Sequence, residues 1–166
     1  MAYVLTTSRL TLRPVTPADH AALLAHWTTP QVREFLFDGA VMTDDEVSGV
    51  IADSVRTFAA DGYGLWLACS PTLIGTAGLR PLDDLGLEIF YSLAPSAQGR
   101  GYATEAAVAV IDHARETLAL PAVFAEIDAG NTASHAVVTR LSMTPFATVP
   151  GLLGPMTRYR LTFPPQ

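Results

Sequence analysis

The strongest constraint in this sequence is a Gly-x-Gly turn that joins an apolar strand directly to a helix. The strand ends around Leu93 and Pro95, and the turn carries Gly99 and Gly101. Glycine adopts positive φ angles readily and lets the backbone approach a ligand closely. Successive amides at the start of the next helix can then point at one anion, aided by the helix dipole. The turn therefore predicts a phosphate site built from backbone. The alternative is that its glycines only tighten the corner.

The helix after this turn is marked by its periodicity. Apolar residues recur at spacings of three and four from residue 103 to residue 118, which predicts one buried face. Glu105 lies in the first turn of this helix. A carboxylate there suits the helix dipole but would repel a phosphate placed too close. We therefore expect the Glu105 side chain to point sideways, away from the anion.

The rest of the chain alternates between predicted strands and helices. Strands are expected over residues 9–13, 64–69, 72–79, 87–93, 122–127 and 158–163. Helices are expected after the capping signals at Thr16 and Thr43, after the Gly-x-Gly turn, and over residues 131–141. Residues 28–42 and 148–157 are expected to form loops. This order predicts a mixed α/β sheet in which a helical crossover joins two parallel strands.

Several motifs in the same order resemble the GNAT N-acetyltransferase superfamily over nearly the whole chain. Residues 98–103 resemble its coenzyme A pyrophosphate loop, and residues 87–91 resemble its central strand. Residues 9–14 resemble the opening of the branch that includes ribosomal-protein and amino-acid N-acetyltransferases. Residues 131–134 resemble its Asn-x-x-Ser helix. The resemblance implies one domain over residues 1–166, with a mixed, mostly antiparallel sheet flanked by helices and a splayed central strand pair.

The chain departs from the family pattern at one position. It carries Ser142 and Met143 where the family usually has Gly-Phe. That position is mainly structural in the family. The departure therefore bears on the local turn more than on activity.

The resemblance also implies acetyl-CoA as the co-substrate. The residues implied to contact it are Tyr91, Leu93, Gln98, Gly99, Arg100, Gly101, Tyr102, Ala103, Thr104, Asn131 and Arg140. Among these, Asn131 is implied to contact the pantetheine amide, and Arg140 to approach the phosphate. From the residues alone, Asn131 could instead cap the helix, and Arg140 could lie on a solvated helix face.

Acetyl transfer to an amine needs a polarised thioester carbonyl, a neutral amine and a stabilised thiolate. Backbone amides can polarise the carbonyl. Glu88 lies between apolar neighbours on a predicted half-buried strand, where a raised pKa would suit it to accept the amine proton. The alternative is that Glu88 is a solvent-facing residue or a structural partner of Arg80 or Arg13. By resemblance, Ser134 approaches the sulfur, where its hydroxyl could protonate the leaving thiolate.

Acidic residues gather ahead of and inside the helix that follows Thr43, and apolar residues 35–37 precede them. The acids are Asp38, Asp44, Asp45 and Glu46. A groove with apolar walls and an acidic rim would favour an amine on a compact, partly apolar body. The alternative is that these acids only cap the helix.

Composition argues against several other classes of protein. The chain has 166 residues, of which 49% are hydrophobic, enough for one domain with a core. Its net charge of −6 argues against a broad nucleic-acid surface. Its four histidines and single cysteine show no metal-ligand spacing, so no metal is expected. No signal peptide is evident and no apolar run approaches the ~20 residues of a membrane span. A cytoplasmic location without membrane partners is therefore expected, and a homodimer is left open.

The sequence thus predicts an acyl-CoA-dependent N-acetyltransferase. The acceptor would be a primary amine, either a protein N-terminus or a small molecule, attacking directly in a ternary complex. One alternative is a non-catalytic acyl-CoA-binding or regulatory domain of the same fold. A second is a nucleotide-binding module, but the longer Gly-x-Gly-x-x-Gly spacing and a following Lys-Ser/Thr are absent.

Overall fold

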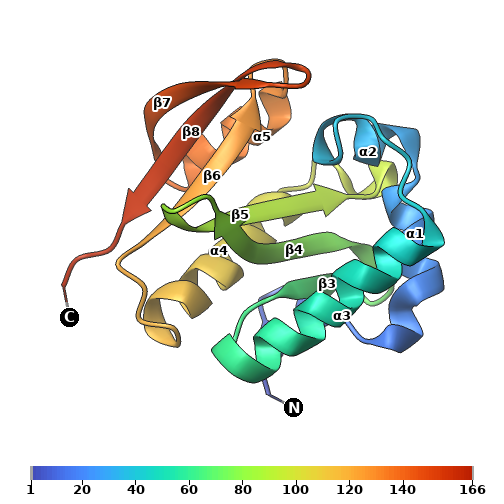
Figure 1. Ribbon diagram of the computed structural model, residues 1–166. Helices are drawn as coiled ribbons and strands as arrows, with labels where there is room; N and C mark the ends of the chain where they lie inside the picture. Colours follow the sequence, from blue (N-terminus) through green and yellow to red (C-terminus); the bar gives the residue numbers. More distant parts are fainter. Residues whose placement is uncertain (1, 166) are drawn as a thin grey trace.

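The computed structural model describes residues 2–165 and shows an eight-stranded sheet with helices on both faces (Figure 1). The strands lie in the order β1-β2-β3-β4-β5-β6-β8-β7. Every neighbouring pair is antiparallel except β5 and β6, which are parallel and joined by the crossover through α4. The predicted mixed, mostly antiparallel sheet is therefore confirmed.

The bounds of the elements are as follows. The strands are β1 (Leu5–Thr6), β2 (Thr11–Pro14), β3 (Leu65–Cys69), β4 (Leu73–Leu82), β5 (Gly86–Leu93), β6 (Ala122–Asp128), β7 (Thr144–Gly151) and β8 (Gly154–Thr162). The helices are α1 (His20–Trp27), α2 (Pro30–Leu36), α3 (Asp44–Asp61), α4 (Tyr102–Glu116) and α5 (Thr132–Arg140). Short 3-10 turns, η1 (Pro17–Asp19) and η2 (Pro95–Ala97), precede α1 and α4.

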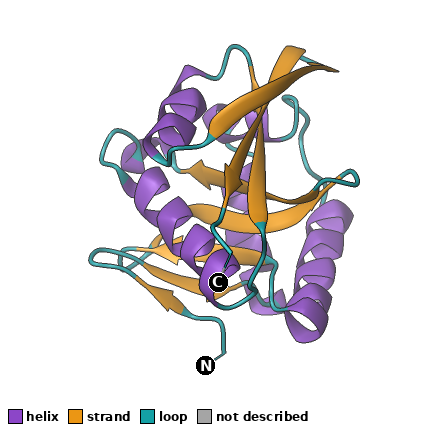
Figure 2. Cartoon of the chain, turned by 90° about the vertical axis from the view of Figure 1, so that its left-hand side faces the viewer, coloured by secondary structure: helices purple, strands orange, loops and turns teal. Residues whose placement is uncertain are grey.

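Two layers of buried side chains hold the helices against the sheet, and Figure 2 shows helices on either side of the strands. One layer includes Val110 of α4 and Val138 of α5, both fully buried. The other includes Leu23 of α1, Val32 of α2 and Val47 of α3. The sheet therefore has an α4–α5 face and an α1–α3 face. No helix within residues 2–165 combines the length and apolar character needed to cross a bilayer.

The two predicted helix starts are both confirmed by their hydrogen bonds. At α3, the Thr43 hydroxyl accepts from the Glu46 amide at 3.2 Å, and the Glu46 carboxylate accepts from the Thr43 amide at 3.4 Å. At η1, the Asp19 carboxylate accepts from the Thr16 amide at 2.8 Å. These reciprocal bonds satisfy amides that have no partner inside the helix.

The prediction of loops at residues 28–42 and 148–157 is wrong, because these segments contribute α2 and part of a β7–β8 hairpin. Pro30 opens α2 at a first-turn position, where a proline needs no amide and its fixed φ suits the helix. Pro145 and Pro150 lie in β7, which is the edge strand beside β8. An edge strand tolerates proline because one side of its backbone has no ladder partner. The short strand β1 was also missed.

The central strands β5 and β6 diverge almost as soon as they meet. Their only registered pair is Glu88 with Phe124, whereas β5 pairs with β4 along its whole length from Gly86 to Leu93. Beyond Glu88, the edge of β5 that faces β6 has no strand beside it. This is the splayed strand pair that the resemblance implies.

The turn after α5 forms even though the chain lacks the family's glycine there. Ser142 adopts φ +64°, in the left-handed region that favours glycine. Its amide donates to the Thr139 carbonyl at 3.0 Å, and the next amide donates to Val138 at 3.0 Å. Met143 then enters the core at 6% exposure. The serine is therefore accommodated at the expense of backbone strain.

Replacing this residue by glycine is expected to stabilise the protein. Ser142→Gly should raise the free energy of unfolding by about 0.5–1 kcal/mol, because relief of the left-handed strain exceeds glycine's entropy cost. Chemical denaturation measures the change. The control, Ser48→Gly on the exposed face of α3, should lower the free energy of unfolding by about 0.5 kcal/mol, because glycine is a poorer helix former than serine. A Ser142→Gly protein that is no more stable than the original would show that the turn is unstrained.

Candidate active site

A cleft of about 1160 Å³ opens where β5 and β6 diverge. Its walls come from β5, β6, α2, α5, the turn before α4 and the β7–β8 hairpin. All but one of the predicted site residues line it: Glu88, Tyr91, Leu93, Gln98, Gly99, Gly101, Tyr102, Ala103, Thr104, Asn131, Ser134 and Arg140. The exception is Arg100, whose exposed side chain is not part of the lining.

The Gly-x-Gly turn has the backbone geometry of an anion site. Gly99 and Gly101 lie at φ +76° and +80°, and a Cβ added at Gly99 would meet no atom within 4 Å. Within residues 2–165, the amides of residues 99–104 donate no hydrogen bond. The Thr104 hydroxyl is buried in the same region and has no partner. These free donors at a helix N-terminus fit a group rich in acceptor oxygens, such as a pyrophosphate.

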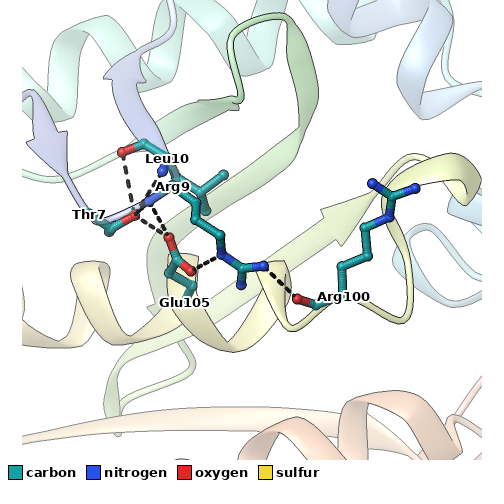
Figure 3. A network of polar contacts seen from close by, with 5 residues as sticks. All are labelled: Thr7, Arg9, Leu10, Arg100 and Glu105. Carbon is teal, nitrogen blue, oxygen red and sulfur yellow. Dashed lines mark hydrogen bonds and ion pairs between the residues drawn. The ribbon is translucent and has the colours of Figure 1, made fainter.

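Glu105 is held to one side of the turn by the segment that precedes β2 (Figure 3). Arg9 donates to its carboxylate from Nε at 2.7 Å and from the backbone amide at 3.0 Å. The Thr7 hydroxyl donates to the same carboxylate. Arg9 also donates to the Arg100 carbonyl at 2.9 Å and stacks 4.4 Å from the Tyr102 ring centroid. The expectation that Glu105 points sideways is confirmed. Arg9 also contacts the turn itself, at Arg100 and Tyr102.

Residues from β5 and α5 meet across the splay. The Tyr91 hydroxyl donates to the Ser134 carbonyl at 3.4 Å, and burial raises the pKa of Tyr91 to about 12. Tyr91 therefore stays protonated as a donor at neutral pH. Gln98 donates to the Leu93 carbonyl at 3.3 Å, which ties the turn back to the strand end.

The Asn131 side chain caps α5, as one of the two sequence interpretations proposed. Its Oδ1 accepts from the Ser134 amide at 3.2 Å. Its Nδ2 makes no hydrogen bond within residues 2–165. The Ser134 hydroxyl likewise has no partner among these residues, and the exposed Arg140 lines the same wall of the cleft. The capping bond therefore leaves the amide nitrogen of Asn131 available to a ligand.

Glu88 lies on the other face of the sheet, toward α1–α3. It is 6% exposed and pairs with Arg80 at 2.7 Å, so Arg80 is the structural partner that the sequence offered as an alternative. Burial raises the pKa of Glu88 even though Arg80 opposes the rise. Across the cleft, Glu126 of β6 pairs with Arg158 at 2.7 Å. Both carboxylates therefore have a fixed cationic partner.

A buried polar chain that sequence reasoning missed ends on β5. His26 of α1 lies 2.8 Å from the Ser92 hydroxyl, which lies 2.7 Å from the Thr76 hydroxyl. Burial lowers the pKa of His26 to about 4, so the ring is neutral at pH 7. No local pattern in α1 marks His26, because its partner Ser92 lies 66 residues away along the chain. This row of hydrogen-bonded side chains holds the end of β5 against α1.

The acidic residues around Thr43 separate in the structure. Asp38 lines the cleft, whereas Asp44, Asp45 and Glu46 form the first turn of α3 and do not line it. The expectation of one acidic rim therefore holds for Asp38 alone. Within residues 2–165 there is no cluster of three or more side chains suited to hold a metal ion.

Comparison with known proteins shows the family to which the chain belongs. A family model described as "Acetyltransferase (GNAT) domain" matches residues 9–144. The chain belongs to the GNAT acetyltransferase family. It is 28% identical over 142 residues to the uncharacterized N-acetyltransferase p20 of Bacillus licheniformis, covering 82% of this chain and 79% of that protein.

Solved GNAT structures share the fold over nearly the whole chain. The acetyltransferase from Agrobacterium tumefaciens superposes with a TM-score of 0.84 at 29% identity, covering 98% of this chain and 96% of that one. RimL, a ribosomal L7/L12 alpha-N-protein acetyltransferase in complex with coenzyme A, superposes with a TM-score of 0.82 at 16% identity, covering 96% and 97%. The GNAT chain described here is an acyl-CoA-dependent acetyltransferase.

Neutralising Glu105 tests how strongly the Arg9 contacts stabilise this GNAT protein. Burial works against ionisation, but the hydrogen bonds from Thr7 and Arg9 hold the pKa of Glu105 below its ordinary value. Glu105→Gln should therefore lower the free energy of unfolding by about 1–2 kcal/mol at neutral pH. The loss is fully present above the unfolded-state pKa of ~4.3 and disappears as the pH falls through the lowered native pKa.

Denaturation curves measured from acid to neutral pH check this expectation. The control is Glu116→Gln at the exposed end of the same helix, whose stability should change by less than about 0.5 kcal/mol. A Glu105→Gln protein with wild-type stability at pH 7 would mean that the Arg9 contacts are not stabilising.

Proposed function

We propose that this protein transfers an acetyl group from acetyl-CoA to a primary amine by direct attack in a ternary complex, as one domain over residues 1–166. The observation that carries the proposal is the cleft itself. One end of it carries free backbone donors at the start of α4, and the other carries carboxylates on the α1–α3 face. An anionic thioester and a cationic acceptor can therefore enter from opposite faces and meet at the splay.

The proposed contacts to the cofactor use the hydrogen-bond donors of the cleft that have no partner in the protein. The amides of residues 99–104 and the Thr104 hydroxyl would hold the pyrophosphate, and Arg140 would add a charge near it. The pantetheine arm would run along the open edge of β5 at Tyr91 and Leu93, with Asn131 Nδ2 donating to one of its amide carbonyls. Acetyl-CoA would supply the thioester, and side chains and backbone of this protein would polarise its carbonyl, protonate the thiolate and accept the proton of the amine.

The thioester carbonyl needs donors at the place where negative charge develops. Main-chain amides of β5 that face β6 have lost their ladder partner beyond Glu88, so they are free to donate there. Ser134 lies across the splay with an unengaged hydroxyl, and we propose that it protonates the leaving thiolate. The buried chain from His26 keeps the end of β5 in place during the transfer.

The amine must be neutral when it attacks. We propose Glu88 as the group that receives its proton, directly or through water, because it is buried in the cleft and burial raises its pKa. A cytoplasmic location is part of the same proposal, since the reaction consumes acetyl-CoA.

The function is tested by release of free thiol from acetyl-CoA with a panel of small amines and peptide N-termini. We expect turnover with at least one acceptor class. The control is Gly101→Glu, which puts a carboxylate into the anion site at a residue with φ +80°. It should lose coenzyme A binding, measured by calorimetry, by more than tenfold while remaining folded. Binding of coenzyme A without turnover on any amine would favour a non-catalytic acyl-CoA-binding domain.

The role of Glu88 is tested by the dependence of turnover on pH. The wild-type rate should rise with pH through the raised pKa of Glu88, because a base works only when it is deprotonated. Glu88→Gln should reduce the rate at least about 100-fold above that pKa and should abolish the inflection. Arg80→Gln should move the inflection to higher pH, because Arg80 lowers the pKa of Glu88. An unchanged pH profile in Glu88→Gln would leave Glu88 as a structural partner of Arg80 only.

A further inference from the structure

The turn that carries the proposed anion site has little in its own sequence to hold it in one conformation. Gly99 and Gly101 flank Arg100 at φ +76° and +80°. Glycine adopts positive and negative φ angles about equally readily, so the peptide unit between Arg100 and Gly101 can rotate easily. A reversed peptide unit would turn the Gly101 amide out of the cleft and the Arg100 carbonyl toward an incoming anion. The orientation of this peptide unit therefore depends on a contact from outside the turn.

Arg9 supplies that contact, from the segment that precedes β2. Its Nη1 donates to the Arg100 carbonyl at 2.9 Å (Figure 3). The peptide bond is trans, and in a trans peptide the carbonyl and the next N–H point in opposite directions. The Gly101 amide therefore points away from the Arg9 guanidinium. Gly101 lines the cleft and Arg9 does not, so this orientation leaves the amide available to a ligand in the cleft.

Two further contacts keep the guanidinium against the turn. It stacks 4.4 Å from the ring centroid of Tyr102, the first residue of α4. A Cβ added at Gly101 would lie 3.4 Å from Nη2 of Arg9, so the guanidinium also packs closely against this glycine. Arg9 thus contacts each of residues 100–102. Rotation of the peptide unit would break a hydrogen bond from a charged donor, which is stronger than one between neutral groups.

Arg9 also compensates a charge that would oppose an anion. Glu105 lies in the first turn of α4, and its carboxylate pairs with Nε of Arg9 at 2.7 Å. The Arg9 backbone amide donates to the same carboxylate at 3.0 Å. Without a cationic partner, this carboxylate would repel a pyrophosphate bound at the start of the same helix. One guanidinium therefore orients a donor and compensates a nearby negative charge.

We infer that Arg9 is a positioning residue for the pyrophosphate of coenzyme A. It acts from outside the cleft, through the Arg100–Gly101 peptide unit and through Glu105. This inference rests on the proposed function, which puts the pyrophosphate on the amides of residues 99–104. A cation that binds the Arg100 carbonyl also polarises the peptide unit, which makes the Gly101 N–H a stronger donor. The arginine thus adds positive charge to the anion site through the backbone.

Calorimetry with coenzyme A measures this effect without turnover. Arg9→Met keeps an unbranched side chain but removes the charge and its donors. The Kd for coenzyme A should rise by at least about tenfold, because a charge-assisted contact and a compensating charge are lost together. 3′-Dephospho-coenzyme A retains the pyrophosphate and should lose affinity by the same factor. The control is Arg56→Met at an exposed residue of α3, which removes the same charge outside the cleft and should leave both Kd values unchanged.

Two further variants separate the two effects of Arg9. Arg9→Lys keeps a charge beside Glu105 but cannot donate to a carboxylate and a carbonyl from one planar fork. Its Kd should lie between those of the wild type and Arg9→Met, and a wild-type Kd would overturn the inference. The double variant Arg9→Met/Glu105→Gln also removes the repelling carboxylate and should recover only part of the lost affinity. Full recovery would show that Arg9 is only a counterion of Glu105 and would overturn the role of the peptide unit.

A merely structural role of Arg9 gives a different result. Reversible unfolding raises the apparent Kd by the reciprocal of the folded fraction. A tenfold rise from this cause would need about nine-tenths of the protein to be unfolded, which circular dichroism would detect. In turnover assays Arg9→Met should raise the KM for acetyl-CoA and leave kcat and the KM for the acceptor within about twofold. A lower kcat with an unchanged KM for acetyl-CoA would overturn the inference.

Nuclear magnetic resonance reports on the peptide unit without any ligand. The Gly101 amide should give one sharp signal in the wild type and in Arg56→Met. In Arg9→Met this signal should shift and broaden, because the Arg100–Gly101 peptide unit rotates between two orientations. An unchanged Gly101 signal in Arg9→Met would overturn the inference.

The outcomes distinguish this inference from the proposed function. A wild-type protein that binds coenzyme A as tightly as Arg9→Met does would overturn the role of Arg9 and leave the function standing. Loss of affinity for coenzyme A but not for its 3′-dephospho form would also overturn it, because the contact would then be to the other phosphate. Binding with the expected Arg9 effect but without turnover on any amine would refute the transfer reaction and retain the positioning role. A wild-type protein that does not bind coenzyme A would refute both.

Discussion

The divergence of β5 from β6 is the constraint on which the rest of the site depends. Parallel strands normally satisfy one another's backbone groups along their length, yet here the registered pairing is limited to Glu88 and Phe124. Unpaired backbone groups in an interior are unfavourable unless a ligand or water satisfies them. The cleft that results connects the two faces of the sheet, so groups on α4 and α5 and groups on α2 and β6 line the same cavity.

Much of the fold could be predicted from local signals, because caps, glycine turns and periodicity act over a few residues. Thr43 with Glu46, and Gly99 with Gly101, are such signals. The two proline-containing segments were wrongly predicted to be loops. Proline opens α2 and is tolerated in β7 because β7 is an edge strand, and the sequence alone does not show which strand lies at the edge of the sheet. The buried contact of His26 with Ser92 was equally invisible, because 66 positions separate the two residues.

The two sides of the cleft differ in their electrostatics, in a chain whose net charge is −6. Such a chain repels a polyanion at long range, and of the arginines near the proposed anion site Arg9 is paired with Glu105 and Arg100 does not line the cleft, which leaves Arg140. In the proposed function the attraction would therefore be local, from Arg140 and from oriented amides at the start of α4, which carry partial positive charge without a side chain. Arg9 contributes by holding those amides in register through the Arg100 carbonyl.

The α1–α3 side of the cleft has the reverse arrangement, with the side-chain carboxylates of Glu88 and Glu126 on the sheet. Glu88 and Glu126 are each paired with an arginine, whereas Asp38, which also lines the cleft, has no arginine partner within residues 2–165. A carboxylate paired with arginine already has its counterion and attracts a further cation weakly, whereas an unpaired buried one interacts strongly because little water screens it. Glu88 and Glu126 are paired in this way, with Arg80 and Arg158, so neither adds an uncompensated charge to the cleft.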